Sequence, residues 1–398
     1  MDVTAKQLLT ACADAGNDAG IAMTTRLVPL GGTGSPVKPA IYAGRRYQLE
    51  RRWWGNPEPV EATDVIVIDN VPSQANRLES ALETLRPALG LPELVLDLGE
   101  IGPLPPDVPS RLSSFRFPHR QADAYLRDSR LGDVPFARTE IGQQVLGATA
   151  DDPTGLLAWF PQALLFGFWQ SHLGKRRSHA KLARSWVSEI IGYGPAATGT
   201  RQLGLKGDPL NLSVDEPVQY DDEDLLGGWE LLEGAKKAAG GKKKDSLAEL
   251  GHGQVPFSES DAALTGISFR AIEQHSTVSF AGLRRIRLAD SEQSAAARSL
   301  LVALGLVAHV AAFSRSFSLR SGCDLRPDEP HWIWHGHEAD EELDRPELAD
   351  VTALFAGCVE QAEACGLPVG SKWPSEPIVL RPSGELAKAI RSTYPLVD

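Results

Sequence analysis

Hydrophobic and polar positions change period along the chain and predict a succession of strands and helices. Residues 64–69 form a short β-branched run that is typical of a buried strand. After an Asn-Val-Pro break, leucines at helical spacing predict a helix over residues 73–86. Ser73 is placed to cap this helix, and the free backbone N–H groups of its first turn favour anions.

Two later segments are predicted to repeat this arrangement. Residues 162–169 form an apolar run that indicates a buried strand, and a polar loop follows at residues 171–179. The apolar positions of residues 180–191 predict a helix that ends at Gly192. Farther along, residues 276–288 predict a strand with a bulge at Gly282, and residues 292–313 predict a helix capped by Asp290 or Ser291.

Together these elements predict an α+β fold without internal repeats. Strand pairs that bracket helices suit a ferredoxin-like β-α-β-β-α-β sheet with large insertions, although periodicity alone leaves the topology open. The Gly- and Lys-rich residues 234–256 and the proline-rich residues 99–109 are typical of insertions. The apolar residues 295–313 include Arg298 and His309, which favours a buried core helix over a membrane span of about 20 uninterrupted apolar residues.

The charge of the chain is unevenly distributed. Its 398 residues are 42% hydrophobic and 23% charged, as in soluble globular proteins, and 40 bases against 52 acids give a net charge of -12. That total disfavours a nucleic-acid partner. However, residues 210–235 hold eight acids and no base, and residues 338–350 hold seven acids and one base, so the remainder is close to neutral. The net charge therefore does not exclude phosphate contacts in the rest of the chain.

Common catalytic and metal-binding motifs are not found in the sequence. The Gly-rich stretches lack the spacing of a P-loop or a dinucleotide fingerprint, and there is no G-x-S-x-G elbow. Four widely spaced cysteines match no zinc pattern and indicate a reducing compartment, so we expect a cytoplasmic protein. His331, His335 and His337 lie beside several acids, but their spacing matches no H-E-x-x-H motif. We favour solvated surface residues there and keep a metal site as the alternative.

Two strips of basic residues are the candidates for phosphate contacts. Residues 172–184 contain five bases and no acid, namely Lys175, Arg176, Arg177, Lys181 and Arg184. Within residues 116–130, the bases that fall on or beside one predicted helix are His119, Arg120, Arg127 and Arg130. Such runs are commonly solvated surfaces, but concentrated positive charge in an acidic chain is what backbone-directed nucleic-acid binding requires.

Several histidines and aromatic residues have a structural interpretation beside a functional one. His275 and His309 lie in predicted core elements and are expected to be hydrogen-bonded core residues. Tyr42, Phe117 and Phe168 can stack on bases or belong to the core, and we favour the core for Phe168.

Several longer motifs together resemble one known family. They run in family order from Thr24 to Pro327 and comprise TTRLVPLGGTGSPVKPAIYA, VIDNVPSQANRLE, FRFPHRQADAYLRDS, ALLFGFWQSHLGKRRSHAKLARSWVSEIIGYG, LGHGQVP, STVSFAGLRRIRL and SLRSGCDLRP. The sequence resembles the RAMP-superfamily crRNA-binding backbone subunit of the type I-G (formerly I-U) CRISPR Cascade complex, which polymerises along the guide RNA. The acidic region after His331 carries no part of this resemblance.

The resemblance implies a single RAMP-type domain over residues 1–398, with a modified ferredoxin-like (RRM-like) palm and insertions that form finger and thumb elements. Insertions are expected at residues 99–160 and, as a flexible thumb-like element, at residues 206–266. Residues 328–398 are expected to form an acidic C-terminal region that packs on the core. The implied partners are crRNA, target DNA through the guide, other copies of the chain in a helical filament and other Cascade subunits, with no membrane.

The resemblance and the basic strips together predict a non-catalytic RNA-binding groove. Its expected residues are Arg26, Ser73, Gln74, Asn76, Arg77, His119, Arg120, Lys175, Arg176, Arg177, His179, Lys181 and Arg184. Backbone subunits of related type III complexes cut target RNA with a loop aspartate, so a metal-dependent endoribonuclease is the alternative. Asp123 and Asp128 are conceivable for that role, but with arginines nearby we prefer ion pairing. We therefore expect no catalytic residue, cofactor or metal.

Overall fold

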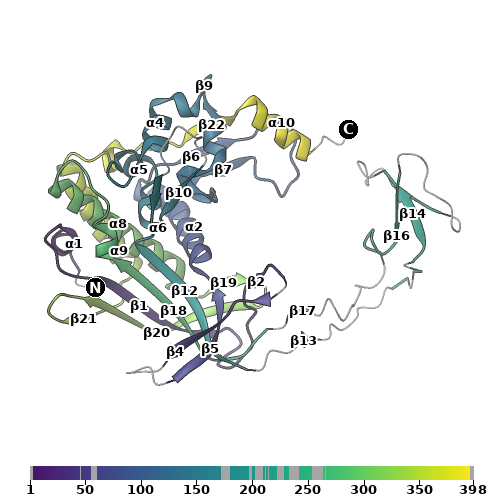
Figure 1. Cartoon of the computed structure of the whole chain (residues 1–398), viewed down its shortest axis with the longest axis horizontal. Coiled ribbons are helices and arrows are strands. Elements are labelled where there is room, and N and C mark those ends of the chain that lie inside the picture. Colours follow the sequence, from purple (N-terminus) through teal and green to yellow (C-terminus); the bar gives the residue numbers. More distant parts are fainter. Residues whose placement is uncertain are drawn as a thin grey trace. The chain divides into compact units, whose positions relative to one another are not determined.

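The computed structural model describes residues 3–44, 46–54, 61–171, 180–196, 200–201, 209–210, 212–213, 215–221, 228–232, 242–252, 263–264 and 266–394. The chain divides into two compact units (Figure 1). The first comprises Met1–Ala196 and Gly266–Leu396, and the second comprises Ala197–Thr265 with Val397–Asp398. The second unit begins and ends close to the insertion expected at residues 206–266. The single domain over residues 1–398, with its insertions, stays a prediction.

An eight-stranded antiparallel sheet forms the centre of the first unit. Its strands are β1 (Gly20–Pro29), β4 (Leu49–Trp54), β5 (Glu61–Asp69), β12 (Trp186–Pro195), β18 (Phe269–Ser279), β19 (Phe317–Arg320), β20 (Cys323–His335) and β21 (Asp340–Leu343). Their order is β19-β20-β1-β18-β12-β5-β4, and β21 also pairs with β20. In the register, Met23 of β1 lies opposite Ser276 of β18 on one side and Trp332 of β20 on the other. The fold is α+β, as the sequence predicts.

Helices lie on one face of this sheet (Figure 1). They are α1 (Ala5–Cys12), α2 (Val71–Leu89) and α8 (Ser291–Phe313), and α9 (Leu348–Ala364) packs against α8. Ile21 and Met23 of β1 join the buried residues of these helices in one core cluster. By length and composition α8 could cross a membrane, but 89% of its apolar window is buried in the protein. It is the buried core helix expected from residues 295–313, and Asp290 caps it as predicted.

The two polar residues inside α8 are accommodated in different ways. Arg298 is fully buried and donates to the carbonyl oxygens of Cys12 (3.1 Å) and Ile286 (2.9 Å) and to Asp14 (2.7 Å). These bonds tie α8 to the end of α1, because a buried guanidinium needs several acceptors. His309 instead lies among the rings of Trp186, Phe313 and Trp332.

The environment of His309 predicts a loss of stability in acid. Burial, with a smaller contribution from the charge of Arg345, lowers the pKa of His309 to about 3. In the unfolded chain a histidine has a pKa of about 6.5 and takes up a proton below that pH. The free energy of unfolding should therefore fall by up to about 1.4 kcal/mol per pH unit as the pH drops from 6.5 towards 3.

We expect His309→Leu to remove this part of the pH dependence, measured by urea unfolding at a series of pH values. The difference in unfolding free energy between wild type and variant should be constant above pH 7 and should shift towards the variant in acid. Parallel curves over the whole pH range would contradict the assignment of a neutral buried imidazole.

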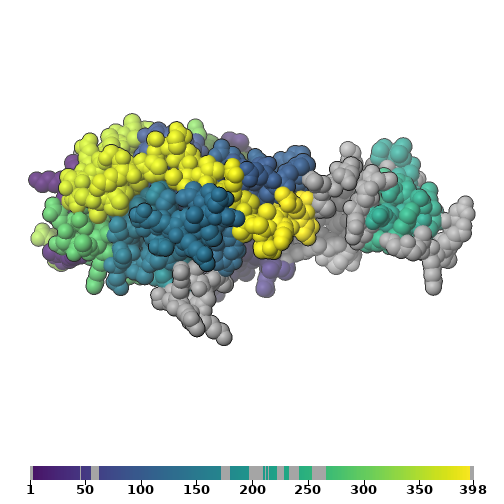
Figure 2. Space-filling model, turned by 90° about the horizontal axis from the view of Figure 1, so that it is seen from above, coloured from purple at the N-terminus to yellow at the C-terminus, as the bar shows by residue number. Residues whose placement is uncertain are grey.

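A second sheet of the first unit joins the middle of the chain to its C-terminal end. Its order is β7-β6-β22-β8-β9, with β6 (Leu94–Asp97), β7 (Arg111–Ser113), β8 (Ser129–Leu131), β9 (Val134–Pro135) and β22 (Ile378–Pro382). In Figure 2 the yellow C-terminal residues lie along the blue residues of the insertion expected at residues 99–160. The C-terminal region also supplies α10 (Gly384–Thr393), and residues 328–335 lie in β20 beside β1, within the sheet itself.

Short helices connect these strands. They are the 3-10 helices η1 (Ser114–Arg116), η2 (Arg120–Ala122), η3 (Phe136–Arg138) and η6 (Gly370–Lys372), and the α-helices α3 (Ala124–Arg127), α4 (Glu140–Gly147), α5 (Thr154–Trp159) and α6 (Pro161–Phe166). The single helix expected across residues 116–130 is therefore wrong: η1, η2, α3 and β8 divide that segment between them.

Two predicted elements on either side of the basic loop are also wrong. The strand expected over residues 162–169 is α6 followed by β10 (Phe168–Gln170), and the helix expected over residues 180–191 is β11 (Ala180–Leu182) followed by β12. A short apolar run does not distinguish a strand from a buried helix. In the second case, β12 pairs with β5 on one side and β18 on the other, and these long-range pairs override the local helical spacing.

Other local predictions are confirmed with changes at their ends. β5 and α2 confirm the predicted strand and helix, but the cap of α2 is Asn70, whose side chain accepts the backbone N–H of Ser73 at 3.1 Å. The strand expected over residues 276–288 ends at Ser279, so Gly282 lies in α7 (Phe280–Leu283) and makes no bulge.

The described residues of the second unit include small antiparallel pieces. β14 (Pro217–Tyr220) lies between β15 (Trp229–Leu231) and β16 (Lys243–Ser246), and β13 (Thr200–Arg201) pairs with β17 (Ala263–Leu264). Part of the loop expected at residues 234–256 thus forms β16 and a turn, and the remainder lies outside the described residues. In the first unit, β2 (Ile41–Tyr42) and β3 (Arg46–Tyr47) form one further pair.

Candidate nucleic-acid interface

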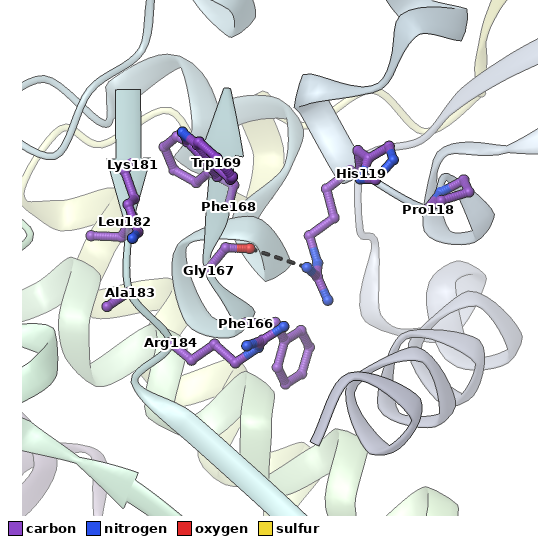
Figure 3. A pocket seen from close by; sticks show the side chains of 11 residues that line it. Pro118, His119, Phe166, Gly167, Phe168, Trp169, Lys181, Leu182, Ala183 and Arg184 are labelled. Atoms are coloured by element: carbon purple, nitrogen blue, oxygen red, sulfur yellow. Dashed lines mark hydrogen bonds between the residues drawn. The ribbon is translucent and has the colours of Figure 1, made fainter. Parts of the chain in front are cut away.

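Described residues of both predicted basic strips line one pocket of the first unit (Figure 3). Its volume is about 410 Å³, and three chain segments line it: residues 118–120, 166–169 and 181–184. The first segment begins before η2, the second leads from α6 into β10, and the third runs out of β11 towards β12. Residues far apart in the sequence therefore share one cavity because β10 and β11 pair.

The pairing of β10 with β11 sets which side chains reach the pocket mouth. Phe168 and Gln170 are buried, while Trp169 between them is 67% exposed, as the alternation of a strand requires. Trp169 lies opposite Lys181 in the register, and the Lys181 Nζ atom is 5.9 Å from the centre of the indole ring (Figure 3). A cation at this distance from an aromatic ring is attracted to it.

The residues between β10 and β11 carry most of the predicted charge. Lys175, Arg176, Arg177 and His179 lie outside the described residues, so their role stays a prediction. The described neighbours Lys181 and Arg184 are both exposed and belong to the pocket lining.

Gly167 allows the chain to turn from α6 into β10 at the floor of the pocket. Its φ of 76° lies in the left-handed region, which favours glycine. A Cβ atom at this position would lie 2.8 Å from both the Arg184 backbone nitrogen and the Leu182 carbonyl oxygen. The backbones of the two lining segments therefore approach each other as closely as glycine permits.

Arg120 is a correction to the predicted set of RNA-binding residues. It is buried, its φ is 53°, and it forms a two-pronged ion pair with Glu79 of α2 in which both N···O distances are 2.8 Å. It also donates to the Gly167 carbonyl oxygen at 3.1 Å (Figure 3). Burial raises the pKa of Glu79, and the charge of Arg120 opposes that rise. Arg120 therefore holds the pocket wall against α2 and has no free donor pair for a phosphate.

The charge left available at the pocket is positive. Lys181 and Arg184 form no ion pair within the described residues, and His119 is an exposed residue of another lining segment. The pKa of Arg184 is lowered, first by loss of hydration and second by the like charge of Arg120. No carboxylate lies among the described lining residues. An anion placed here would meet two cations and no carboxylate among the described lining residues.

Most of the predicted residues at the start of α2 donate hydrogen bonds to one buried aspartate. Asp69, fully buried at the end of β5, accepts from Ser73 Oγ at 2.9 Å, Gln74 Nε2 at 2.6 Å and Arg77 Nε at 2.9 Å. Arg320 of β19 completes the group at 2.9 Å. Gln74 is fully buried, and its side-chain Oε1 atom accepts hydrogen bonds from the side chains of Ser188 and Gln274.

Gln74 is therefore wrong as an RNA contact, because it links α2 to the sheet. Of this group, only Asn76 is exposed, while Ser73 and Arg77 are half-buried. Their contact with RNA stays a prediction.

Arg26 lies apart from the pocket residues, on the face of the sheet opposite to Ile21 and Met23. Its Nη1 atom is 3.5 Å from Glu329. The same face carries His275, which contacts the hydroxyl group of Tyr193 at 2.9 Å and Glu273 at 3.2 Å. His275 is hydrogen-bonded, as expected, but it is half-exposed, whereas His309 is the buried core residue.

The remaining sequence candidates are engaged in pairs. His331 lies 3.1 Å from Glu342, and His335 lies 2.9 Å from Asp340. Within the part of the chain that the structure describes, no group of three His, Cys, Asp or Glu residues could hold a metal ion.

The two candidate aspartates and the candidate aromatic residues are also accounted for. Asp128 forms the expected ion pair with Arg127 at 2.7 Å, while Asp123 accepts the backbone N–H groups of Tyr125 and His119. Phe117 and Phe168 are buried core residues, and Tyr42 is half-buried.

Two residues of this site were missed by sequence reasoning. Trp169 falls within the buried strand predicted for residues 162–169. In the structure it is the middle residue of β10, so its side chain points away from the buried side chains of Phe168 and Gln170. Glu79 carries no local signal, since its partner Arg120 is 41 residues away.

One family model matches part of the chain. Residues 21–196 are similar to CRISPR-associated proteins, and the matching family model is that of CRISPR-associated protein GSU0053. The match covers less than half of the chain, from β1 to the end of β12, and includes all three segments of the pocket. No curated protein matches the chain. The match supports a CRISPR-associated protein with a role in CRISPR defence.

Proposed function

We propose that the chain is a non-catalytic crRNA-binding backbone subunit of a type I CRISPR surveillance complex, of the type I-G kind. In this role, copies polymerise along the guide RNA beside other Cascade subunits and present the guide for pairing with target DNA. The observation that carries the proposal is the pocket at β10 and β11. It gathers exposed cations with no carboxylate among its described lining residues, in a chain whose net charge is -12.

The order of the main elements supports a ferredoxin-like, RRM-like palm of the RAMP superfamily. Along the chain, β1, α2, β12, β18, α8 and β20 follow as strand, helix, strand, strand, helix and strand. Across the sheet these strands lie in the order β20-β1-β18-β12. The second unit is inserted between β12 and β18, where we assign the thumb. The smaller sheet is inserted largely between α2 and β12, where we assign the finger elements.

The chemistry of the pocket fits recognition of the RNA backbone. Lys181 and Arg184 offer charged donors to phosphate oxygens, which bind a strand without reading its sequence. Sequence information is then left to base pairing between guide and target, as in other guide-directed systems. All four cysteines are free thiols, which supports a reducing cytoplasmic location.

The proposal is tested by expressing the full chain together with a guide array and purifying it. We expect an absorbance ratio at 260 and 280 nm that indicates bound nucleic acid, and recovery of guide-length RNA from the protein. Protein free of nucleic acid would contradict the proposal and favour a protein-only adaptor. Cleavage of labelled guide or target RNA with divalent metal, lost in His335→Ala, would identify a nuclease instead.

A further inference from the structure

Trp169 has the position of a stacking platform. An indole ring that is 67% exposed at the mouth of a cavity is available to a ligand, and Lys181 beside it brings a positive charge to the same spot. Trp53 has a similar exposure of 68%, but it lies on the edge strand β4 and lines no described cavity. Exposure alone is common at protein surfaces. The combination with the cavity and the cation distinguishes Trp169.

The cavity has the size of a single small ligand. A volume of about 410 Å³ lies at the lower end of the range of roughly 300–1,000 Å³ that is typical of small-molecule pockets. A double helix is far too large for it, whereas one base of an unstacked strand is of the right order. The apolar part of the lining comes from Phe166, Phe168 and Leu182, and the polar part from the basic side chains.

The charges of the cavity add a preference for a phosphate. Arg120 is ion-paired with Glu79. Arg184 feels the charges of both residues but forms no ion pair among the described residues, so its guanidinium group is the one available to a phosphate. In Figure 3 Trp169 lies beside Lys181, and Arg184 lies on another part of the lining. A ligand that spans the cavity therefore meets the indole ring with Lys181 beside it at one end and the guanidinium group of Arg184 at the other.

We propose that this cavity takes one nucleotide of single-stranded RNA, with its base stacked on Trp169 and the adjoining phosphates on Lys181 and Arg184. The inference rests on the proposed function, because the strand is the guide RNA that the chain is proposed to bind. It adds that the site senses the presence of a base as well as the phosphate charge. Stacking is tolerant of sequence because every base has an aromatic face.

The test compares fluorescein-labelled oligo(U) with an abasic RNA of the same length, using full-length protein freed of bound RNA. Trp169→Ala should weaken binding of oligo(U) by at least about 5-fold, since stacking contributes roughly 1–3 kcal/mol per base. It should leave binding of the abasic strand unchanged. The slope of log affinity against log salt should stay the same, because no phosphate contact is lost.

Three further variants serve as matched controls. Trp169→Phe keeps an aromatic face and should retain most of the affinity for oligo(U). Trp53→Ala removes an equally exposed indole outside the cavity and should have no effect. Arg184→Gln should weaken binding of both strands by a similar factor and reduce the salt slope by about 0.7.

The outcomes separate the two proposals. If the wild-type protein binds neither strand, the proposed function itself is overturned. If it binds oligo(U) and Trp169→Ala binds equally well, the stacking site is wrong and the RNA-binding role stands. An equal loss of affinity for oligo(U) and the abasic strand in Trp169→Ala would also overturn the stacking site, since the indole would then act through Lys181 alone.

Discussion

Replacing Lys175, Arg176, Arg177, Lys181 and Arg184 together with glutamine is expected to weaken RNA binding by about 10³-fold at 0.1 M salt. Each phosphate contact to a single strand contributes about 0.7 to the slope of log affinity against log salt, which corresponds to roughly a 5-fold change between 0.1 and 1 M. The slope of the variant should fall by about 3.5 if all five side chains contact phosphates. The effect should be nearly uniform across RNA sequences, because these contacts carry no base readout.

A variant with the same loss of charge provides the control for this result. Exposed bases away from the pocket lining can be replaced in equal number, namely Lys6, Arg111, Arg287, Arg381 and Lys388. Its affinity should change by much less, since only the long-range field of the protein is altered. Fluorescence anisotropy with a short labelled RNA over a salt series measures both variants. Equal losses in the two would show that net charge, and not the pocket, governs binding.

Asp69→Asn is expected to destabilise the first unit by about 3 kcal/mol. Asp69 is fully buried and is the shared acceptor of Arg77 and Arg320, whose side chains are 28% and 25% exposed. Asparagine keeps the shape of the side chain but leaves both guanidinium groups without a counter-charge, and it presents an N–H₂ group to donors. These contacts join β5, α2 and β19, so the loss should appear as a lower urea midpoint of unfolding.

The same substitution at Asp64 is the matched control, because this residue lies on the same strand and is exposed. Asp64→Asn should change the unfolding free energy by less than about 0.5 kcal/mol. If the two variants unfold at the same urea concentration, Asp69 does not organise the end of β5 in the way that its contacts indicate.

The position of the functional site was partly predictable from the sequence. The basic residues on both sides of the pocket are adjacent in the sequence to apolar runs, and their concentration in an acidic chain is visible without a structure. The sequence does not show which of these basic side chains remain available to a ligand. Arg120 and Lys181 look equivalent in the sequence, yet Arg120 is buried against Glu79 and Lys181 is exposed. An ion pair across 41 residues leaves no local pattern.

The sequence by itself determined the α+β class, a strand at residues 64–69, a helix at residues 73–86, the buried helix α8 and the two basic strips. Local periodicity, capping and charge act within a few residues and are therefore visible in the sequence. Only the tertiary structure decided that residues 180–195 are strands, that Gln74 belongs to the interior and that Trp169 faces solvent. Those outcomes depend on pairing with β5, β10 and β18 and on partners brought in from distant parts of the chain. Burial and strand pairing are settled by the whole fold, and at these positions they outweigh local preference.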